Sequence, residues 1–152
     1  MSLLQRIDQD VKAALKSGDT LKRQTLGMVK AALSNYRIAQ RKTELDDADV
    51  ISVLTKEVKS RKDSAAEYTK AGARDRADKE EQEVALLNEY LPAQMSQQEI
   101  GTVVSAALQK TGAKGLKDMG KVMGVVSKEL KGRADLKAVN ELVKRLLGQP
   151  GA

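Results

Sequence analysis

The stretch LKDMGKVMGVVSKEL, residues 116–130, divides into two faces when it is placed on a helix. At 100° per residue an arc of about 100° contains the apolar side chains of Met119, Val122, Met123, Val126 and Leu130. The lysines fall on the opposite arc, and Lys131 extends them past the end of the stretch. This pattern predicts an amphipathic helix with a core face and a cationic face. The predicted cationic face comprises Lys117, Lys121, Lys128 and Lys131.

Two glycines lie beside these lysines inside the predicted helix. Gly120 and Gly124 each destabilise a helix interior by roughly 1 kcal/mol relative to alanine, so a compensating role is expected. One interpretation is close packing of a neighbouring helix against the glycines. The other is a smooth backbone surface on which an RNA phosphate backbone settles between the lysines. The sequence leaves both interpretations open.

The segments around this helix predict a small three-helix bundle over residues 93–152. Ser96 and Glu99 form a capping-box pattern that starts one helix, and Gly112 ends it. Asp118 is expected to cap the middle helix. The last helix begins after Asp135 and closes at the Gly-Gln-Pro sequence of residues 148–150.

Residues 1–92 predict an N-terminal domain of four helices. Gly18 and Gly72 end two of them, and the fourth is expected to run to Tyr90 before Pro92 stops it. Strand-like alternation of useful length is absent, so the fold class is all-α. The domain boundary is placed at residues 92 and 93. Arg61, on the apolar line of the third helix, is interpreted as an ion-paired structural arginine.

Charge is distributed unevenly between the two predicted domains. Residues 1–92 contain 17 Lys and Arg against 16 acids, whereas residues 93–152 contain 10 against 5. A basic domain indicates an acidic partner, with nucleic acid first among the candidates, although a solvated lysine-rich surface is the alternative. Because the second domain has no aromatic residue for base stacking, recognition of folded RNA through its backbone is favoured. Further candidate contacts are Arg133, Lys137, Lys144 and Arg145.

Catalytic chemistry has little support in this sequence. With no cysteine and no histidine, a Cys/His zinc site and His-assisted nucleophilic catalysis are excluded. No acidic cluster has convincing metal-ligand spacing. We therefore expect no catalytic residue, no metal and no cofactor. The sequence also lacks an apolar segment long enough to cross a membrane and a recognisable signal peptide, which predicts a cytoplasmic protein without membrane contact.

Several motifs resemble those of the YqeY-like proteins, also called the GatB/YqeY family. They are Tyr90-Leu91-Pro92, the DMGKVMG sequence of residues 118–124, the GRAD sequence of residues 132–135 and the closing helix from Val139. The resemblance covers essentially the whole chain. One departure is Gly27, where an arginine commonly follows the leucine in the family, so an arginine role at this position does not transfer.

The resemblance implies a function that the residues alone do not. The C-terminal domain is similar to the tail of the B subunit of the tRNA-dependent amidotransferase, which contacts tRNA. Family membership therefore implies tRNA binding and a label of carbon–nitrogen ligase with glutamine as amido donor, although the residues for that chemistry are absent. An amidotransferase or an aminoacyl-tRNA synthetase is the implied protein partner. We expect a tRNA-binding helper; a helical protein-interaction adaptor and an unrecognised amide-transferring enzyme are the alternatives.

Overall fold

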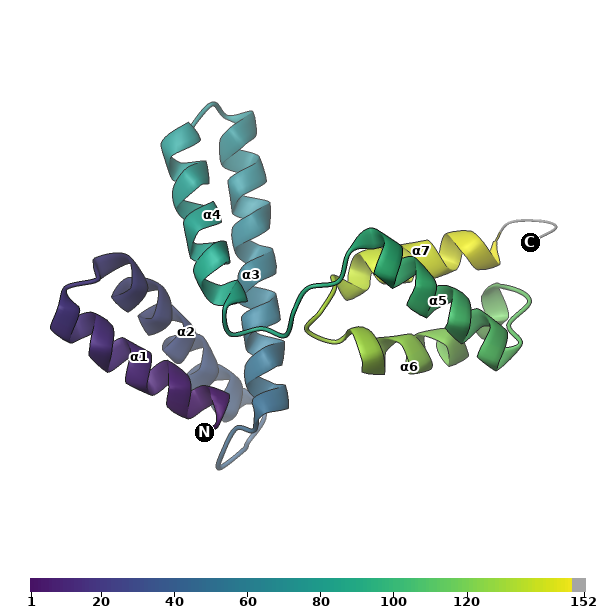
Figure 1. Cartoon of the computed structure of the whole chain (residues 1–152), viewed down its shortest axis with the longest axis horizontal. Helices are drawn as coiled ribbons and strands as arrows, with labels where there is room; N and C mark the ends of the chain where they lie inside the picture. Colours follow the sequence, from purple (N-terminus) through teal and green to yellow (C-terminus); the bar gives the residue numbers. More distant parts are fainter. Residues whose placement is uncertain (149–152) are drawn as a thin grey trace. The chain divides into compact units, whose positions relative to one another are not determined.

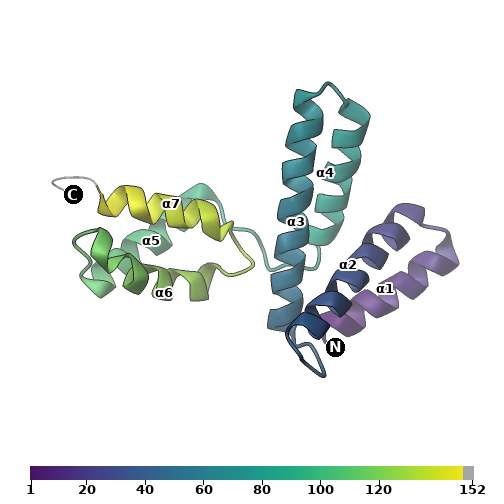
Figure 2. The same cartoon turned by 180° about the vertical axis from the view of Figure 1, so that it is seen from behind.

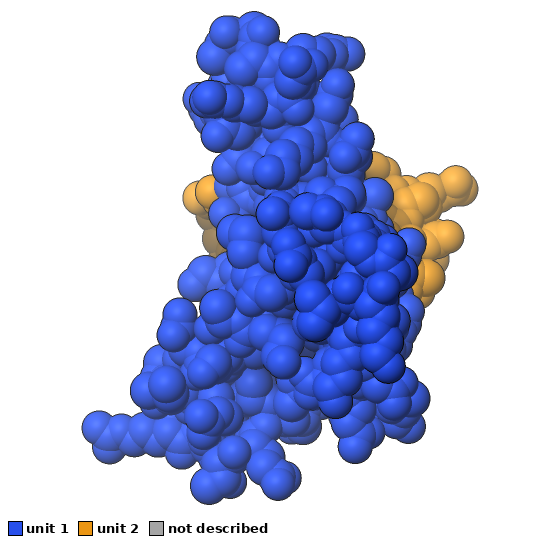
Figure 3. Space-filling view, turned by 90° about the vertical axis from the view of Figure 1, so that its left-hand side faces the viewer, with its two compact units in different colours: residues 1–92 blue, residues 93–152 orange. Residues whose placement is uncertain are grey.

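The chain folds entirely as helices in the part that the structure describes. The structure is a computed structural model, and it describes residues 1–148 (Figures 1 and 2). These residues form seven α-helices and one short 3-10 turn, with no β-strand among them. The chain divides into two compact units, residues 1–92 and 93–152 (Figure 3). The predicted all-α class is confirmed.

Unit 1 consists of two helical hairpins that diverge from each other (Figures 1 and 2). The first pairs α1 (Leu3–Ser17) with α2 (Thr20–Ala39), and the second pairs α3 (Asp47–Lys70) with α4 (Arg74–Asn88). Gly18 turns the chain between α1 and α2 at φ 76°, a conformation that glycine adopts without a steric penalty. The fourth helix ends at Asn88, two residues before the predicted end.

Aliphatic side chains from all four helices form the core of unit 1, since the chain has no Phe or Trp. Ile7, Leu26, Leu54 and Leu87, one from each helix, are fully buried. Met28, also on α2, is 58% exposed. The face of α2 that turns away from this core is therefore open.

Tyr90 connects the end of unit 1 to α1 through side-chain contacts. Its side chain is buried, its hydroxyl donates a hydrogen bond to Asp10, and the Arg6 guanidinium lies 4.6 Å from the ring centre. Burial and this hydrogen bond raise the pKa of the Tyr90 hydroxyl, so the hydroxyl stays protonated as a donor. The Tyr-Leu-Pro motif therefore has a structural role at the end of unit 1.

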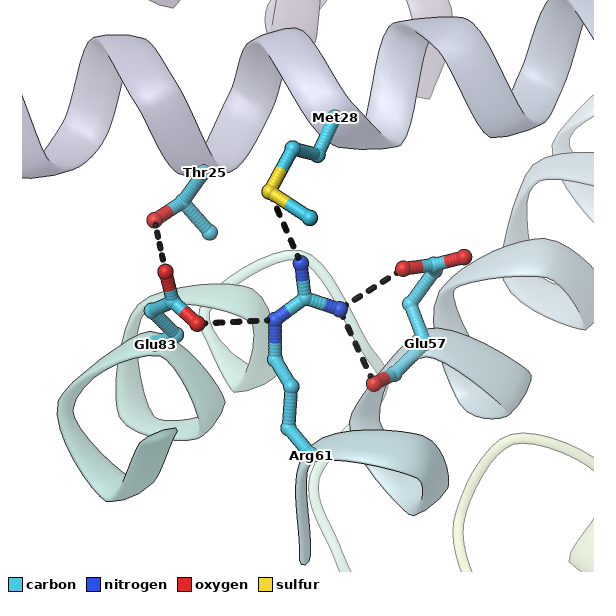
Figure 4. A network of polar contacts seen from close by, with 5 residues as sticks. All are labelled: Thr25, Met28, Glu57, Arg61 and Glu83. Atoms are coloured by element: carbon cyan, nitrogen blue, oxygen red, sulfur yellow. Dashed lines mark hydrogen bonds and ion pairs between the residues drawn. The ribbon is translucent and has the colours of Figure 1, made fainter. Parts of the chain in front are cut away.

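Arg61 is the centre of a buried polar network that joins α2, α3 and α4 (Figure 4). Its Nη1 donates to Glu57 Oε2 at 2.7 Å and its Nε donates to Glu83 Oε2 at 3.2 Å, while Thr25 donates to the other Glu83 oxygen at 3.4 Å. The Met28 sulfur lies 3.9 Å from Arg61 Nη2. The structural interpretation of Arg61 is confirmed, and its acidic partners come from its own helix and from α4.

Unit 2 contains α5 (Gln97–Thr111), the turn η1 (Leu116–Asp118), α6 (Met119–Leu130) and α7 (Leu136–Leu147). Its core contains Val104, Val122, Val126 and Val143. The predicted Ser96 capping box is present, and Asp135 caps α7 through the Lys137 amide. Gly148 follows α7 as predicted, whereas Gln149 and Pro150 lie outside the described residues.

Candidate nucleic-acid interface

A shallow groove of about 430 Å³ lies along α6 where the sequence predicts the cationic face. Lys121 and Lys128, two turns apart on α6, are both exposed and line the groove. Lys110, from the last turn of α5, contributes a third cation. The remaining lining residues are Gly120, Gly124, Val125 and Glu129. The groove therefore has three lysines and a single acid.

The two glycines of this groove face open space. A Cβ atom built on Gly120 or on Gly124 meets no heavy atom within 4 Å. Close packing of another helix of unit 2, within the described residues, against the glycines is therefore excluded. The glycines leave the helix backbone bare beside Lys121 and Lys128. This finding removes the packing interpretation for the helices of unit 2, and the RNA interpretation stays a prediction.

Lys117 and Asp118 lie in η1, just before α6. Lys117 is exposed. Asp118 occupies the N-cap position, but the predicted cap is wrong, because its side chain makes no capping hydrogen bond to α6. Its Oδ2 instead accepts from the Lys114 amide at 3.0 Å, and this backbone hydrogen bond lowers the pKa of the Asp118 carboxyl. Asp118 thus stabilises the turn that leads Lys117 into α6.

Lys131 and Arg133 follow α6 and differ in their surroundings. Lys131 is exposed at the C-cap. Arg133 is half-buried, its Nε donates to the Ala93 carbonyl at 3.3 Å, and its own carbonyl accepts from the Met95 amide at 2.9 Å. Arg133 therefore holds the first residues of unit 2 against the turn after α6, a role that sequence reasoning did not predict.

The candidate residues of α7 do not form one cluster. Lys137 and Lys144, seven residues apart, are exposed on the same side of the helix. Arg145 lines a second groove of about 460 Å³, formed by α5 and α7, together with Gln97 and Glu141. The structure thus brings Lys121 and Lys128 together with both glycines and places Arg145 in a different groove.

The groove on α6 contains lysines and a backbone surface, but no constellation for bond chemistry. In residues 1–148 no group of three or more His, Cys, Asp or Glu side chains is arranged to hold a metal ion. No helix in this part of the chain is long and apolar enough to span a bilayer. The arrangement can hold an anionic, extended ligand through charge and close approach.

These features define a small, two-unit, all-helical protein with an exposed cationic groove. The family model described as Yqey-like protein matches residues 4–147. The chain therefore belongs to the YqeY-like family, and the resemblance noted from its motifs is confirmed.

Curated relatives come from fungi and share one name, altered inheritance of mitochondria protein 41, mitochondrial. The relative from Vanderwaltozyma polyspora is 33% identical over 119 residues, 74% of this chain and 64% of its own length. That from Kluyveromyces lactis is 32% identical over 87 residues, 57% of this chain and 47% of its own. That from Pyrenophora tritici-repentis is 28% identical over 150 residues, 96% of this chain and 81% of its own. The chain thus spans less than two thirds of the first two relatives.

The predicted cytoplasmic location is contradicted by these relatives, which are named as mitochondrial proteins. The prediction rested on the absence of an apolar span and of a recognisable signal peptide. Neither the absence of an apolar span nor the absence of a recognisable signal peptide distinguishes a protein of the cytoplasm from one in the interior of a mitochondrion. The cytoplasmic prediction is therefore withdrawn.

Proposed function

We propose that unit 2 binds the phosphate backbone of folded RNA, with tRNA as the class of RNA, through the groove on α6. The single observation that carries this proposal is the pair of open glycines, Gly120 and Gly124, beside Lys121 and Lys128 on α6. Each glycine costs about 1 kcal/mol of helix stability, and no packing among the described residues of unit 2 offsets that cost. A ligand that approaches the backbone closely would use the surface that the glycines leave bare.

Charge and composition favour RNA backbone over a single strand with splayed bases. Lys110, Lys121 and Lys128 provide point charges for phosphates, which set affinity and position without reading sequence. Residues 93–152 contain no aromatic side chain on which a base stacks. A helical RNA surface, recognised by its shape, suits such a groove.

The other candidate cations have secondary roles in this proposal. Exposed Lys117 and Lys131 extend the α6 surface beyond each end of the helix, and Lys137 and Lys144 provide charge from α7. Arg145 contributes only through the net positive potential of the unit. The guanidinium of Arg133 has Nη donors left for a phosphate while its Nε holds Ala93.

The adaptor alternative requires an exposed apolar patch beside the glycines. Val125 is the one large apolar side chain in the lining of the groove, and it is half-buried. Protein-binding helix grooves present several apolar anchors at three- and four-residue spacing. The geometry therefore favours RNA over a helical protein partner at this site.

At the level of the whole chain, we propose a tRNA-binding helper whose two units are separate domains. The choice of tRNA as the ligand follows from the motif resemblance, which implies kinship of residues 93–152 with the tail of an amidotransferase subunit. The same resemblance suggests a tRNA-handling enzyme, an amidotransferase or an aminoacyl-tRNA synthetase, as partner. Separate cores in residues 1–92 and 93–152 support the division into domains. The chemistry of amide transfer is assigned to such a partner.

The test is fluorescence anisotropy of labelled tRNA with the full chain at 50 and 200 mM salt. Contacts to roughly three to five phosphates predict a loss of about one to two decades of affinity over this range. The variant Lys121→Glu/Lys128→Glu should bind more weakly and with a shallower salt dependence. The control is Lys56→Glu/Lys62→Glu on α3, which makes the same change in net charge in unit 1. Equal affinity of the two variants would refute the assignment of the groove.

A further inference from the structure

Unit 1 has a near-neutral net charge, but its two helical hairpins carry net charges of opposite sign. Residues 1–43, which contain all of α1 and α2, hold nine Lys and Arg against three acids, Asp8, Asp10 and Asp19. Residues 44–92, which contain α3 and α4, hold thirteen acids against eight Lys and Arg. A polyanion would therefore be attracted to the first hairpin and repelled by the second.

The cations of α2 form one line along the helix. Arg23, Lys30 and Arg37 repeat every seven residues, which places them within about 40° of one another around the axis. At 1.5 Å per residue the line is about 21 Å long. All three residues are exposed, and α2 contains no acid at all. Two turns separate neighbours in this line, as they separate Lys121 from Lys128 on α6.

Small exposed residues border this line, as they border the lysines of α6. Gly27 lies in the middle of α2, and a Cβ atom built on it meets nothing within 4 Å. Ala31 and Ser34, on the same side of the helix, are also exposed. The two helices thus share an arrangement of cations seven residues apart beside an open glycine, although they belong to different units.

The cations of this line are available to a ligand. Arg23 and Arg37 make no ion pair with any described residue, and Arg37 shares a groove with Glu44 without pairing with it. Lys30 pairs with Asp8 of α1 at 3.0 Å, and both side chains are more than 40% exposed. An exposed pair of this kind contributes little, so a phosphate competes for Lys30.

The remainder of α2 argues against an anionic membrane as the ligand. A surface-bound amphipathic helix inserts its apolar face into the lipid. The apolar face of α2, with Leu26, Val29 and Leu33, is buried in the core of unit 1. Among the large apolar residues of α2 only Met28 and Ile38 are well exposed, at 58% and 65%, and two such residues do not form an apolar face that inserts into lipid.

From this arrangement we infer that the outer face of α2, with Arg23, Lys30 and Arg37 beside Gly27, is a second RNA-backbone contact. The inference rests on the proposed function, because the two faces would hold the same RNA. It assigns to unit 1 a direct part in binding, and the acidic α3–α4 hairpin keeps the RNA on the α1–α2 side. Two contacts on one RNA would also raise the overall affinity through effective concentration.

The experiment measures tRNA anisotropy across a salt series with the full chain and three double variants. These are Arg23→Glu/Arg37→Glu on α2, Lys121→Glu/Lys128→Glu on α6, and the matched control Lys56→Glu/Lys62→Glu on α3. Each lost phosphate contact removes about 0.7–0.9 from the slope of log affinity against log salt. A double variant that loses two phosphate contacts is therefore expected to bind tRNA about 25- to 60-fold more weakly at about 0.1 M salt. Circular dichroism melts confirm that each variant is folded.

Each outcome decides between the two assignments. If the α2 and α6 variants are both weakened beyond the α3 control, the inference of a second contact is supported. If the α2 variant matches the control while the α6 variant is weakened, the inference is overturned and the proposed function stands. If only the α2 variant is weakened, the α6 assignment fails and the α2 contact remains. Sedimentation of the full chain and of the α2 variant tests self-association as another role of the basic hairpin. If the α2 variant loses self-association but binds tRNA with unchanged affinity, the inference is also overturned.

Discussion

The substitution Gly124→Ala separates the stability of α6 from its proposed binding role. Gly124 lies inside α6, and a Cβ atom at this position meets nothing within 4 Å. No steric cost opposes the intrinsic preference of alanine for the helix, which is about 0.8–1.0 kcal/mol over glycine. The variant is therefore expected to raise the unfolding free energy of unit 2 by about that amount.

The same methyl group is expected to weaken RNA binding. A bare backbone allows Cα–H contacts to phosphate oxygens, each worth about 0.5–1 kcal/mol, and a Cβ atom holds the phosphate away. Loss of one such contact corresponds to a two- to fivefold weaker complex, at about 1.4 kcal/mol per tenfold. Gly124→Ala thus predicts a more stable protein that binds less well.

The control is Gly101→Ala in α5. Gly101 is also inside a helix and also faces open space, but it does not line the α6 groove. It should give a comparable gain in stability with unchanged RNA affinity. Any difference in affinity between the two variants then reports the position of the methyl group, because helix propensity changes equally in both.

Amide hydrogen exchange of Val122 and Val126 measures the stability of α6 in the intact chain. All three tyrosines lie in residues 1–92, so tyrosine fluorescence during unfolding follows unit 1 and should not change. A loss of stability in Gly124→Ala would refute the claim that a Cβ atom at this position meets no neighbouring atom. A gain of stability with tRNA affinity equal to that of Gly101→Ala would refute the close-approach role.

Other perturbations test the remaining structural claims. Arg61→Ala should destabilise unit 1 by about 3–5 kcal/mol in urea unfolding followed by tyrosine fluorescence, because Glu83 would be left buried without its cation; a loss below 1 kcal/mol would contradict the network. Lys30→Ala breaks an exposed pair and should cost no more than about 1 kcal/mol in the same assay. Ser96→Ala should destabilise α5 by about 0.5–2 kcal/mol, visible as faster amide exchange at its first turn, and unchanged exchange would contradict the capping box. The pKa of the Asp118 carboxyl is depressed below 3.8 in the folded state, so the carboxylate stabilises the fold above pH 3.8 and this stabilisation is lost as the pH falls through the folded-state pKa. NMR titration of the carboxyl should show the low pKa. Asp118→Asn should remove this part of the acid sensitivity of unfolding.

Much of the fold was predictable because its signals are local. The capping box at Ser96, the cap at Asp135 and the glycines at positions 18, 72 and 112 act within one helical turn, and each has the predicted effect in the structure. Asp118 is the exception: it has a cap residue's position, but its side chain is taken by the Lys114 amide across the preceding turn. When a side chain has two possible hydrogen-bond partners, the sequence pattern alone does not show which of them it binds.

The candidate site was predictable in part, because a lysine line follows from helical periodicity. Lys121 and Lys128 were found in this way, whereas Lys110 reaches the groove from another helix and carries no sequence signal beyond its place in the last turn of α5. The open space around Gly120 and Gly124, and the hydrogen bond of Arg133 to Ala93, depend on packing between elements. Such tertiary information is what a single sequence lacks.

The most direct test of the central claim is an NMR titration of the ¹⁵N-labelled full chain with tRNA at low salt. The amide signals of Gly120, Gly124 and Gly101 report the α6 groove and a matched position outside it. The account predicts that Gly120 and Gly124 shift or broaden early in the titration, that Gly101 changes least, and that about 200 mM salt reverses the effect. Uniform changes across all three glycines, or none while tRNA binds, would contradict the assignment of the α6 groove as the RNA-binding surface.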